Sequence, residues 1–218
     1  MQGKPKPVRA HEREVGKGEK MKSIMISIQP KWCAKIESGA KTIEVRKTRP
    51  KIETPFKCYI YCTFPQKPVY DIWINRGTEN RFLGNGKVIG EFVCNNIEKF
   101  VVGSLACDDV EKQVCLSYKE ICDYFYGENY DNTVRIGYGW HISELKIYDK
   151  PKELGEFYRR LSEKVLEEGD YDCRKDENVI CLDYWDGGGD NCQDCPFGGK
   201  VYLTRPPQSW CYVEELED

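Results

Sequence analysis

Short segments of β-type sequence dominate the first hundred residues and restrict the chain to a mainly β fold. Four stretches combine β-branched and aromatic residues with alternation or a short apolar run, and they lie at residues 23–28, 42–47, 57–64 and 86–100. The one helical pattern among them begins at Pro30 and ends at Gly39. A strand, one short helix and then further strands indicate a small core built mainly from β-structure.

The second half of the chain adds two helices and two strands to this prediction. Residues 117–127 open with a capping-box pattern and close with a glycine, which predicts a helix. Residues 153–169 are amphipathic and also end in a glycine, so a further helix is expected there. The two strands are expected at residues 138–149, where Pro151 would stop the strand, and at residues 208–216.

Charge and composition divide the chain into three parts. Residues 1–21 are basic and almost free of large apolar side chains, so we expect a disordered tail, with Met21 as an alternative translation start. Residues 22–155 together with residues 204–216 would form the folded domain. Residues 156–203 would form a helix and a cysteine-rich, acidic insertion. The net charge of −3 excludes a protein coated with basic residues for nucleic acid.

Export and membrane signals are missing from the sequence. No stretch approaches the roughly 18 apolar residues of a membrane span, and residues 1–21 lack the apolar run of a secretory signal. The twelve cysteines would suggest a disulfide framework in a secreted protein. Without an export signal, a cytoplasmic protein with reduced thiols is the expectation.

The strand at residues 42–47 has two different faces. Ile43 and Val45 share one face, and Thr42, Glu44 and Arg46 share the other, because successive side chains of a strand point to opposite sides. The first face requires a core. The second face is either the hydrated side of an edge strand or part of a functional site, and the pattern alone leaves both interpretations open.

This strand also belongs to a longer motif, G-x-K-x-x-E-x-R, whose four fixed positions are filled by Gly39, Lys41, Glu44 and Arg46. On this motif the chain resembles the ASCH domain of the PUA-like superfamily. The stretches IQPKWCAKIESG and RPPQSWCYVEEL further resemble ASCH proteins of phages and low-GC Gram-positive bacteria. The resemblance implies an α+β, mainly β fold: a PUA-like (ASCH) pseudo-β-barrel with two to three flanking helices and a Cys-rich insertion.

The resemblance also implies a cleft lined by the motif, with RNA, nucleotides or modified nucleosides as ligands. Cations would hold phosphate, a carboxylate would accept from a base or ribose, and a tryptophan would stack on a base. Residues 31–51 carry a net charge of +5, which favours polyanions. The structural alternatives are an ion-pair ladder and core tryptophans. The candidate ligand-binding residues are Trp32, Lys41, Glu44, Arg46, Gln208, Ser209 and Trp210.

Catalysis is the second hypothesis, because some members of the family are RNases or N4-acetylcytidine amidohydrolases. In the amidohydrolase branch, a lysine at the third motif position acts with a threonine at the sixth. Lys41 matches that lysine, but Glu44 stands where the threonine would be. A carboxylate beside Lys41 would also favour the ammonium form, which cannot take a proton. The catalytic candidates, should the protein be an enzyme, are Lys41, Glu44 and the hydroxyl of Thr42.

Four cysteines in the insertion suggest a zinc site. Cys173, Cys181, Cys192 and Cys195 are spaced C-x7-C-x10-C-x2-C, and four thiolates form a closed, structural tetrahedral site. The irregular spacing leaves a metal-free cluster open, and ligand recognition requires no cofactor. The acidic insertion supports a third hypothesis, a phage-encoded interaction protein that binds a host factor.

Overall fold

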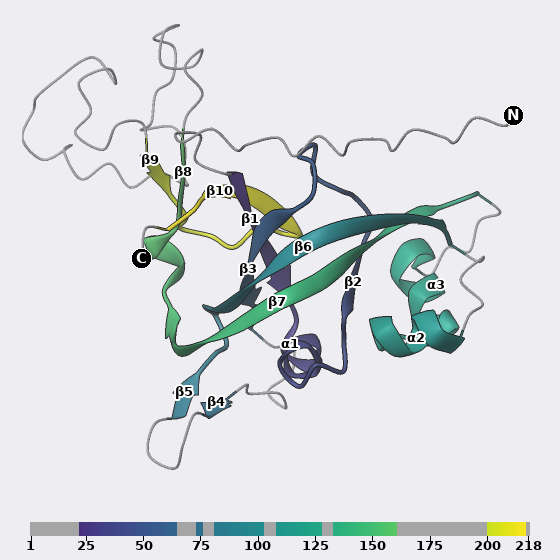
Figure 1. Cartoon of the computed structure of the whole chain (residues 1–218), viewed down its shortest axis with the longest axis horizontal. Helices are drawn as coiled ribbons and strands as arrows, with labels where there is room; N and C mark the ends of the chain where they lie inside the picture. Colours follow the sequence, from purple (N-terminus) through teal and green to yellow (C-terminus); the bar gives the residue numbers. More distant parts are fainter. Residues whose placement is uncertain are drawn as a thin grey trace, which may run out of the picture.

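One six-stranded sheet organises the protein (Figure 1). The computed structural model describes residues 22–64, 73–75, 81–102, 108–127, 133–160 and 200–216. The strand order is β10-β1-β3-β6-β7-β2, and every neighbouring pair is antiparallel except β1 and β3. The strands are β1 (Lys22–Ile28), β2 (Ile43–Arg46), β3 (Phe56–Cys62), β6 (Lys87–Val101), β7 (Ile136–Lys152) and β10 (Trp210–Glu214).

The predicted α+β, mainly β class is confirmed. Because β10 and β2 form the two edges of the sheet and do not pair with each other, the sheet is open rather than a closed barrel. Figure 1 shows α2 and α3 together beside β2. The remaining elements are α1 (Pro30–Glu37), α2 (Asp108–Val114), α3 (Tyr118–Tyr126), the 3-10 turn η1 (Leu154–Glu156), and two small pairs, β4 (Trp73–Asn75) with β5 (Arg81–Leu83) and β8 (Tyr158–Arg160) with β9 (Lys200–Tyr202).

Both faces of the sheet are covered, which explains the continuous apolar run of β1. Ile24 and Ile26 face a core that includes Ile36 of α1. Met25, between them, faces a second core with Phe157 and Val213. A strand buried on both faces reads as an unbroken apolar stretch instead of an alternating one.

Two predictions for residues 138–169 are wrong where the structure describes them. Pro151 does not stop β7, because it lies where the register moves from Ile147 opposite Gly90 to Lys152 opposite Val88, and a proline is tolerated at such an irregularity.

The second wrong prediction is the helix expected at residues 153–169. Residues 153–160 instead form η1 and β8, since Phe157 is fully buried in the core and β8 pairs with β9. The rest of that predicted helix lies outside the described residues.

Several other predictions also lie outside the described residues. The basic tail at 1–21 is one, and the whole cysteine cluster of the insertion is another. In the part of the chain that the structure describes, no group of three or more His, Cys, Asp or Glu side chains is arranged for a metal ion. None of the described helices is long and apolar enough to cross a membrane.

Candidate functional site

The polar face of β2 is buried. Ile43 and Val45 pack against α2 and α3, as an apolar face should. Glu44 and Arg46, on the opposite face, are only 6% and 7% exposed, and Lys41 just before the strand is 2% exposed. The interpretation of a hydrated edge strand is therefore wrong: β2 is an edge strand, but other segments of the chain cover its charges.

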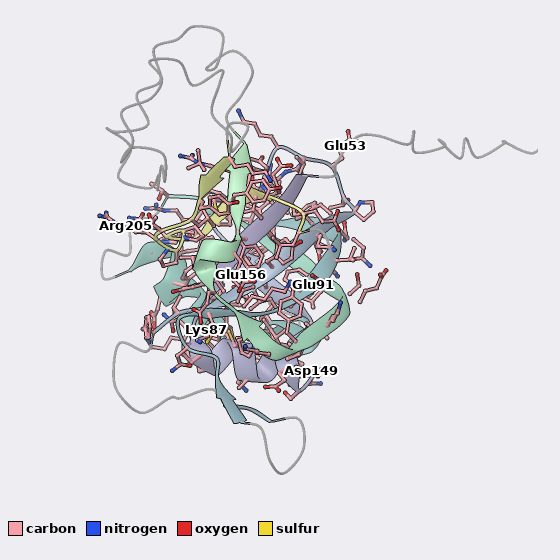
Figure 2. The ribbon with its side chains drawn as sticks, turned by 90° about the vertical axis from the view of Figure 1, so that its left-hand side faces the viewer. Glu53, Lys87, Glu91, Asp149, Glu156 and Arg205 are labelled. Atoms are coloured by element: carbon pink, nitrogen blue, oxygen red, sulfur yellow. The ribbon has the colours of Figure 1, made fainter. Side chains whose placement is uncertain are left out.

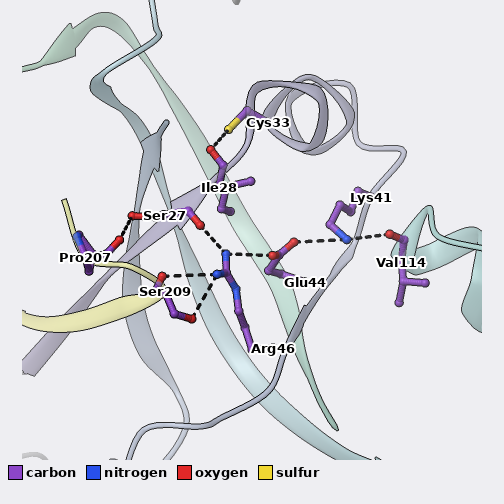
Figure 3. Close-up of polar contacts among 9 residues, drawn as sticks. All are labelled: Ser27, Ile28, Cys33, Lys41, Glu44, Arg46, Val114, Pro207 and Ser209. Carbon is purple, nitrogen blue, oxygen red and sulfur yellow. Dashed lines mark hydrogen bonds and ion pairs between the residues drawn. The ribbon is translucent and has the colours of Figure 1, made fainter. Parts of the chain in front are cut away.

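These three charged side chains form one continuous chain of contacts (Figure 3). The Lys41 Nζ donates to the carbonyl oxygen of Val114 at 2.7 Å and lies 3.3 Å from Glu44 Oε2. The other oxygen, Glu44 Oε1, lies 3.0 Å from Arg46 Nη2. Each oxygen of the carboxylate thus faces a different cation, which is the ion-pair ladder considered from the sequence.

Arg46 extends the chain to segments that are distant in sequence. Its Nη2 donates to the carbonyl oxygen of Ser27 at 2.7 Å, and its Nη1 lies 3.3 Å from Ser209 Oγ. The hydroxyl of Ser27 donates to the carbonyl oxygen of Pro207 at 2.6 Å. The guanidinium therefore holds the end of β1 and the segment before β10 against β2.

The buried charges do not balance. With all three groups ionised, Lys41 and Arg46 contribute two positive charges against the single negative charge of Glu44. The hydrogen bond to Val114 and the ion pair account for two of the three N–H donors of Lys41. The Nε of Arg46 has no hydrogen-bond partner among the described residues. Because a buried charge is costly unless it is paired, this excess favours an acceptor or an anion from outside.

A cleft of about 820 Å³ opens over this chain of charges. Its walls come from α1, α3, the residues after β3 and the segment before β10. The ring of Trp32 lies 4.1 Å from the Nζ of Lys31 and 5.3 Å from that of Lys41. Across the site, Tyr124 on α3 has the Nζ of Lys47 at 5.0 Å from its ring. Aromatic faces next to cations suit a planar ligand that carries negative charge.

The wall contributed by α3 is acidic. Glu120 and Asp123 line the cleft on the same helix as Tyr124. Hydrogen bonds from the backbone and side chain of Ser117 lower the pKa of Glu120, so it is ionised at neutral pH. Partial burial raises the pKa of Tyr124, and its phenol stays neutral. Asp123 is paired with Lys119 at 2.7 Å, so the cleft has a cationic floor and one wall whose net negative charge comes from Glu120.

Six of the seven predicted ligand-binding residues line the cleft. These are Trp32, Lys41, Glu44, Arg46, Gln208 and Ser209. Trp210 does not; it is half-buried and packs against the core residue Trp140 with ring centroids 6.0 Å apart, and its indole nitrogen donates to Thr48. Thr42, the candidate hydroxyl, is exposed, and the described cleft does not include it.

Sequence reasoning missed the α3 side of the cleft. Tyr124 belongs to no sequence motif. The capping box of α3 predicts a helix, but it does not indicate which part of the sheet that helix covers. Phe64, 68% exposed at the cleft, was also missed. The available signal in the sequence was an aromatic residue at the end of the strand predicted at residues 57–64.

A second group of charges shows what an ordinary ion-pair network looks like in this protein. Glu91 on β6, labelled in Figure 2, accepts a hydrogen bond from the hydroxyl of Tyr148 at 2.7 Å and lies 3.7 Å from Lys57. Lys57 also pairs with Glu215, and Lys146 approaches Glu91. These side chains are 18–62% exposed and their charges balance, in contrast to the group at the cleft.

No family model and no curated protein matches this chain. Among solved structures, the chain is similar to ASCH from Zymomonas mobilis, with 19% identity, a TM-score of 0.42, and coverage of 87% of this chain and 86% of that one. Two point mutants of the same protein match at 18% identity, also with TM-scores of 0.42, and cover 87–88% of this chain and 88–89% of theirs. These structures carry the family name that the motif suggested. At these values the likeness carries neither a ligand nor a reaction to this chain.

Proposed function

We propose that this protein recognises RNA, a nucleotide or a modified nucleoside in the cleft above Lys41, Glu44 and Arg46. The observation that carries the proposal is the buried excess of one positive charge at the floor of a cleft that also has Trp32 and Tyr124 in its walls. Aromatic stacking together with charge is how proteins hold single nucleotides and single strands.

The site supports recognition more directly than it supports hydrolysis. Glu44 stands at the motif position where the hydroxyl nucleophile would be needed, and its Oε2 is instead paired with Lys41 Nζ at 3.3 Å. Two of the hydroxyls that line the cleft also have other roles, because Ser27 donates to Pro207 and Ser209 lies 3.3 Å from Arg46 Nη1. Binding without chemical change is the expected behaviour.

Mass spectrometry of the protein after incubation with short RNAs, ordinary nucleotides and N4-acetylcytidine tests this proposal. We expect at least one member of the panel to be retained unchanged, and to be lost when Lys41→Ala is used. Conversion of a panel member by the intact protein alone would replace recognition with catalysis. If nothing is retained at low salt, the proposed function is wrong.

A further inference from the structure

We infer that a nucleotide enters this cleft with its base at Lys41 and leaves its phosphate at the rim, near Lys31 and Lys47. This inference rests on the proposed function and adds the orientation of the ligand. It follows from a difference between the two ends of the cleft: the floor has few remaining donors and little access to water, whereas the rim has exposed cations.

The floor can satisfy one or two acceptor atoms better than a whole phosphate. Among the described contacts, those with Val114 and Glu44 leave Lys41 with one N–H donor. Arg46 uses its Nη atoms on Ser27, Ser209 and Glu44, and its Nε has no partner among the described residues. A phosphate would bring up to two negative charges and several oxygens to a place that offers one net positive charge. Removing such an anion from water costs far more than removing a base carbonyl.

The rim offers what a phosphate needs. Lys31 is exposed, lies on the first turn of α1 and lines the cleft. Lys47 is exposed and does not itself line the cleft, but its Nζ lies 5.0 Å from the ring of Tyr124, which does. An anion beside either lysine keeps much of its hydration, so its desolvation cost is small.

The acidic wall narrows the choice further. Glu120 would repel a phosphate that lay along α3 inside the cleft, whereas the charge of Asp123 is offset by Lys119 at 2.7 Å. The same carboxylates can accept hydrogen bonds from amino groups or ribose hydroxyls. A base placed between Trp32 and this wall meets hydrogen-bond donors at Lys41 and acceptors on α3. The edge of a base also presents both donors and acceptors, so the two patterns can pair.

Titration calorimetry of the full-length protein distinguishes the two orientations. The probes are the four common ribonucleosides, their 5′-monophosphates, inorganic pyrophosphate and a short single-stranded RNA, at low salt. We expect the 5′-phosphate to improve the affinity of a bound nucleoside by about fivefold to tenfold. The double variant Lys31→Ala/Lys47→Ala should lose that gain and keep the affinity for the nucleoside. The matched control is Lys35→Ala/Lys51→Ala, which removes two exposed lysines that neither line the described cleft nor lie against Trp32 or Tyr124 in the described contacts, and it should keep the gain.

Lys41→Met should weaken nucleoside, nucleotide and RNA alike, by roughly 10-fold to 100-fold. The Lys31 and Lys47 variants change only exposed residues, so the test holds even if Lys41→Met fails to fold.

Three results would overturn the orientation and leave the proposed function standing. The first is that pyrophosphate competes with a nucleoside for the cleft and needs Lys41 to do so. The second is that the 5′-phosphate still improves the affinity of a nucleoside in Lys31→Ala/Lys47→Ala. The third is that folded Lys41→Met binds RNA as tightly as the unaltered protein. If no nucleoside, nucleotide or RNA binds, the orientation and the proposed function both fail.

Discussion

At the scale of single residues, the site depends on one carboxylate between two cations. Glu44 is the only acidic partner that the described contacts give to the side chains of Lys41 and Arg46. Both cations are almost completely buried, so water cannot replace the carboxylate at low cost. The motif allowed this grouping to be predicted, because its fixed positions lie within eight residues of sequence. The burial of the group was not predictable, because it depends on Ser27 and Ser209, which are distant in the chain.

Replacing Glu44 should therefore destabilise the protein strongly. We expect Glu44→Gln to lower the free energy of unfolding by about 3–5 kcal/mol, since two buried cations lose their counter-charge. Urea unfolding measures this change. Glu98→Gln is the matched control, because Glu98 is 60% exposed and its loss should cost less than about 1 kcal/mol. Equal stability of the two variants would show that the buried charges are not coupled.

At the scale of elements, the turn between α1 and β2 sets the position of Lys41. Gly39 ends α1 with φ at +74°, and the backbone N–H of Lys41 then donates to the carbonyl oxygen of Lys35. The helix, this turn and the strand were all predictable from local sequence, because glycine spacing and apolar periodicity carry the information. The position of α2 was not predictable, since we recognised no capping residue and no periodic apolar pattern in its sequence. It nevertheless supplies the Val114 carbonyl that holds Lys41.

Gly39→Ala tests the importance of this turn. The positive φ disfavours any residue with a Cβ, so we expect a loss of about 1 kcal/mol or more in unfolding free energy. No atom lies within 4 Å of the added Cβ, so the loss would reflect backbone conformation and not a clash. Gly155→Ala is the matched control, because it has the same open surroundings without a positive φ and should be nearly neutral. If Gly155→Ala costs as much, the backbone explanation fails.

At the scale of the whole molecule, a doubly covered sheet holds together segments that are far apart in sequence. The cleft takes residues from the end of β1, from β2, from α3 and from the segment before β10. The same packing fully or partly buries cysteines on α1 and on strands of the sheet. Burial raises the pKa of Cys33 and Cys58 well above the ordinary value, that of Cys94 to about 12 and that of Cys211 to about 11.

Stability should therefore fall as the pH rises above about 8.5. In the unfolded chain these thiols ionise near pH 8.5, whereas in the folded protein they stay protonated, so the unfolded state binds fewer protons. The free energy of unfolding should decrease by up to about 1.4 kcal/mol per pH unit for each such thiol. Urea unfolding under reducing conditions at pH 7–10 measures this slope. Cys58→Ala should make it shallower, and an unchanged slope in that variant would contradict the explanation.

The most direct test of the central claim is a titration of the protein and of Trp32→Ala with a short single-stranded RNA and with a nucleotide at low salt. Trp32 lines the cleft, whereas the half-buried Trp210 packs against Trp140 outside the cleft lining, so Trp210→Phe serves as the matched control once both variants are shown to be folded. We expect Trp32→Ala to lose about 1–3 kcal/mol of binding free energy, the usual contribution of stacking by one ring, and Trp210→Phe to bind as the unaltered protein does. Equal affinity of Trp32→Ala and the unaltered protein would show that the cleft is not where the ligand binds.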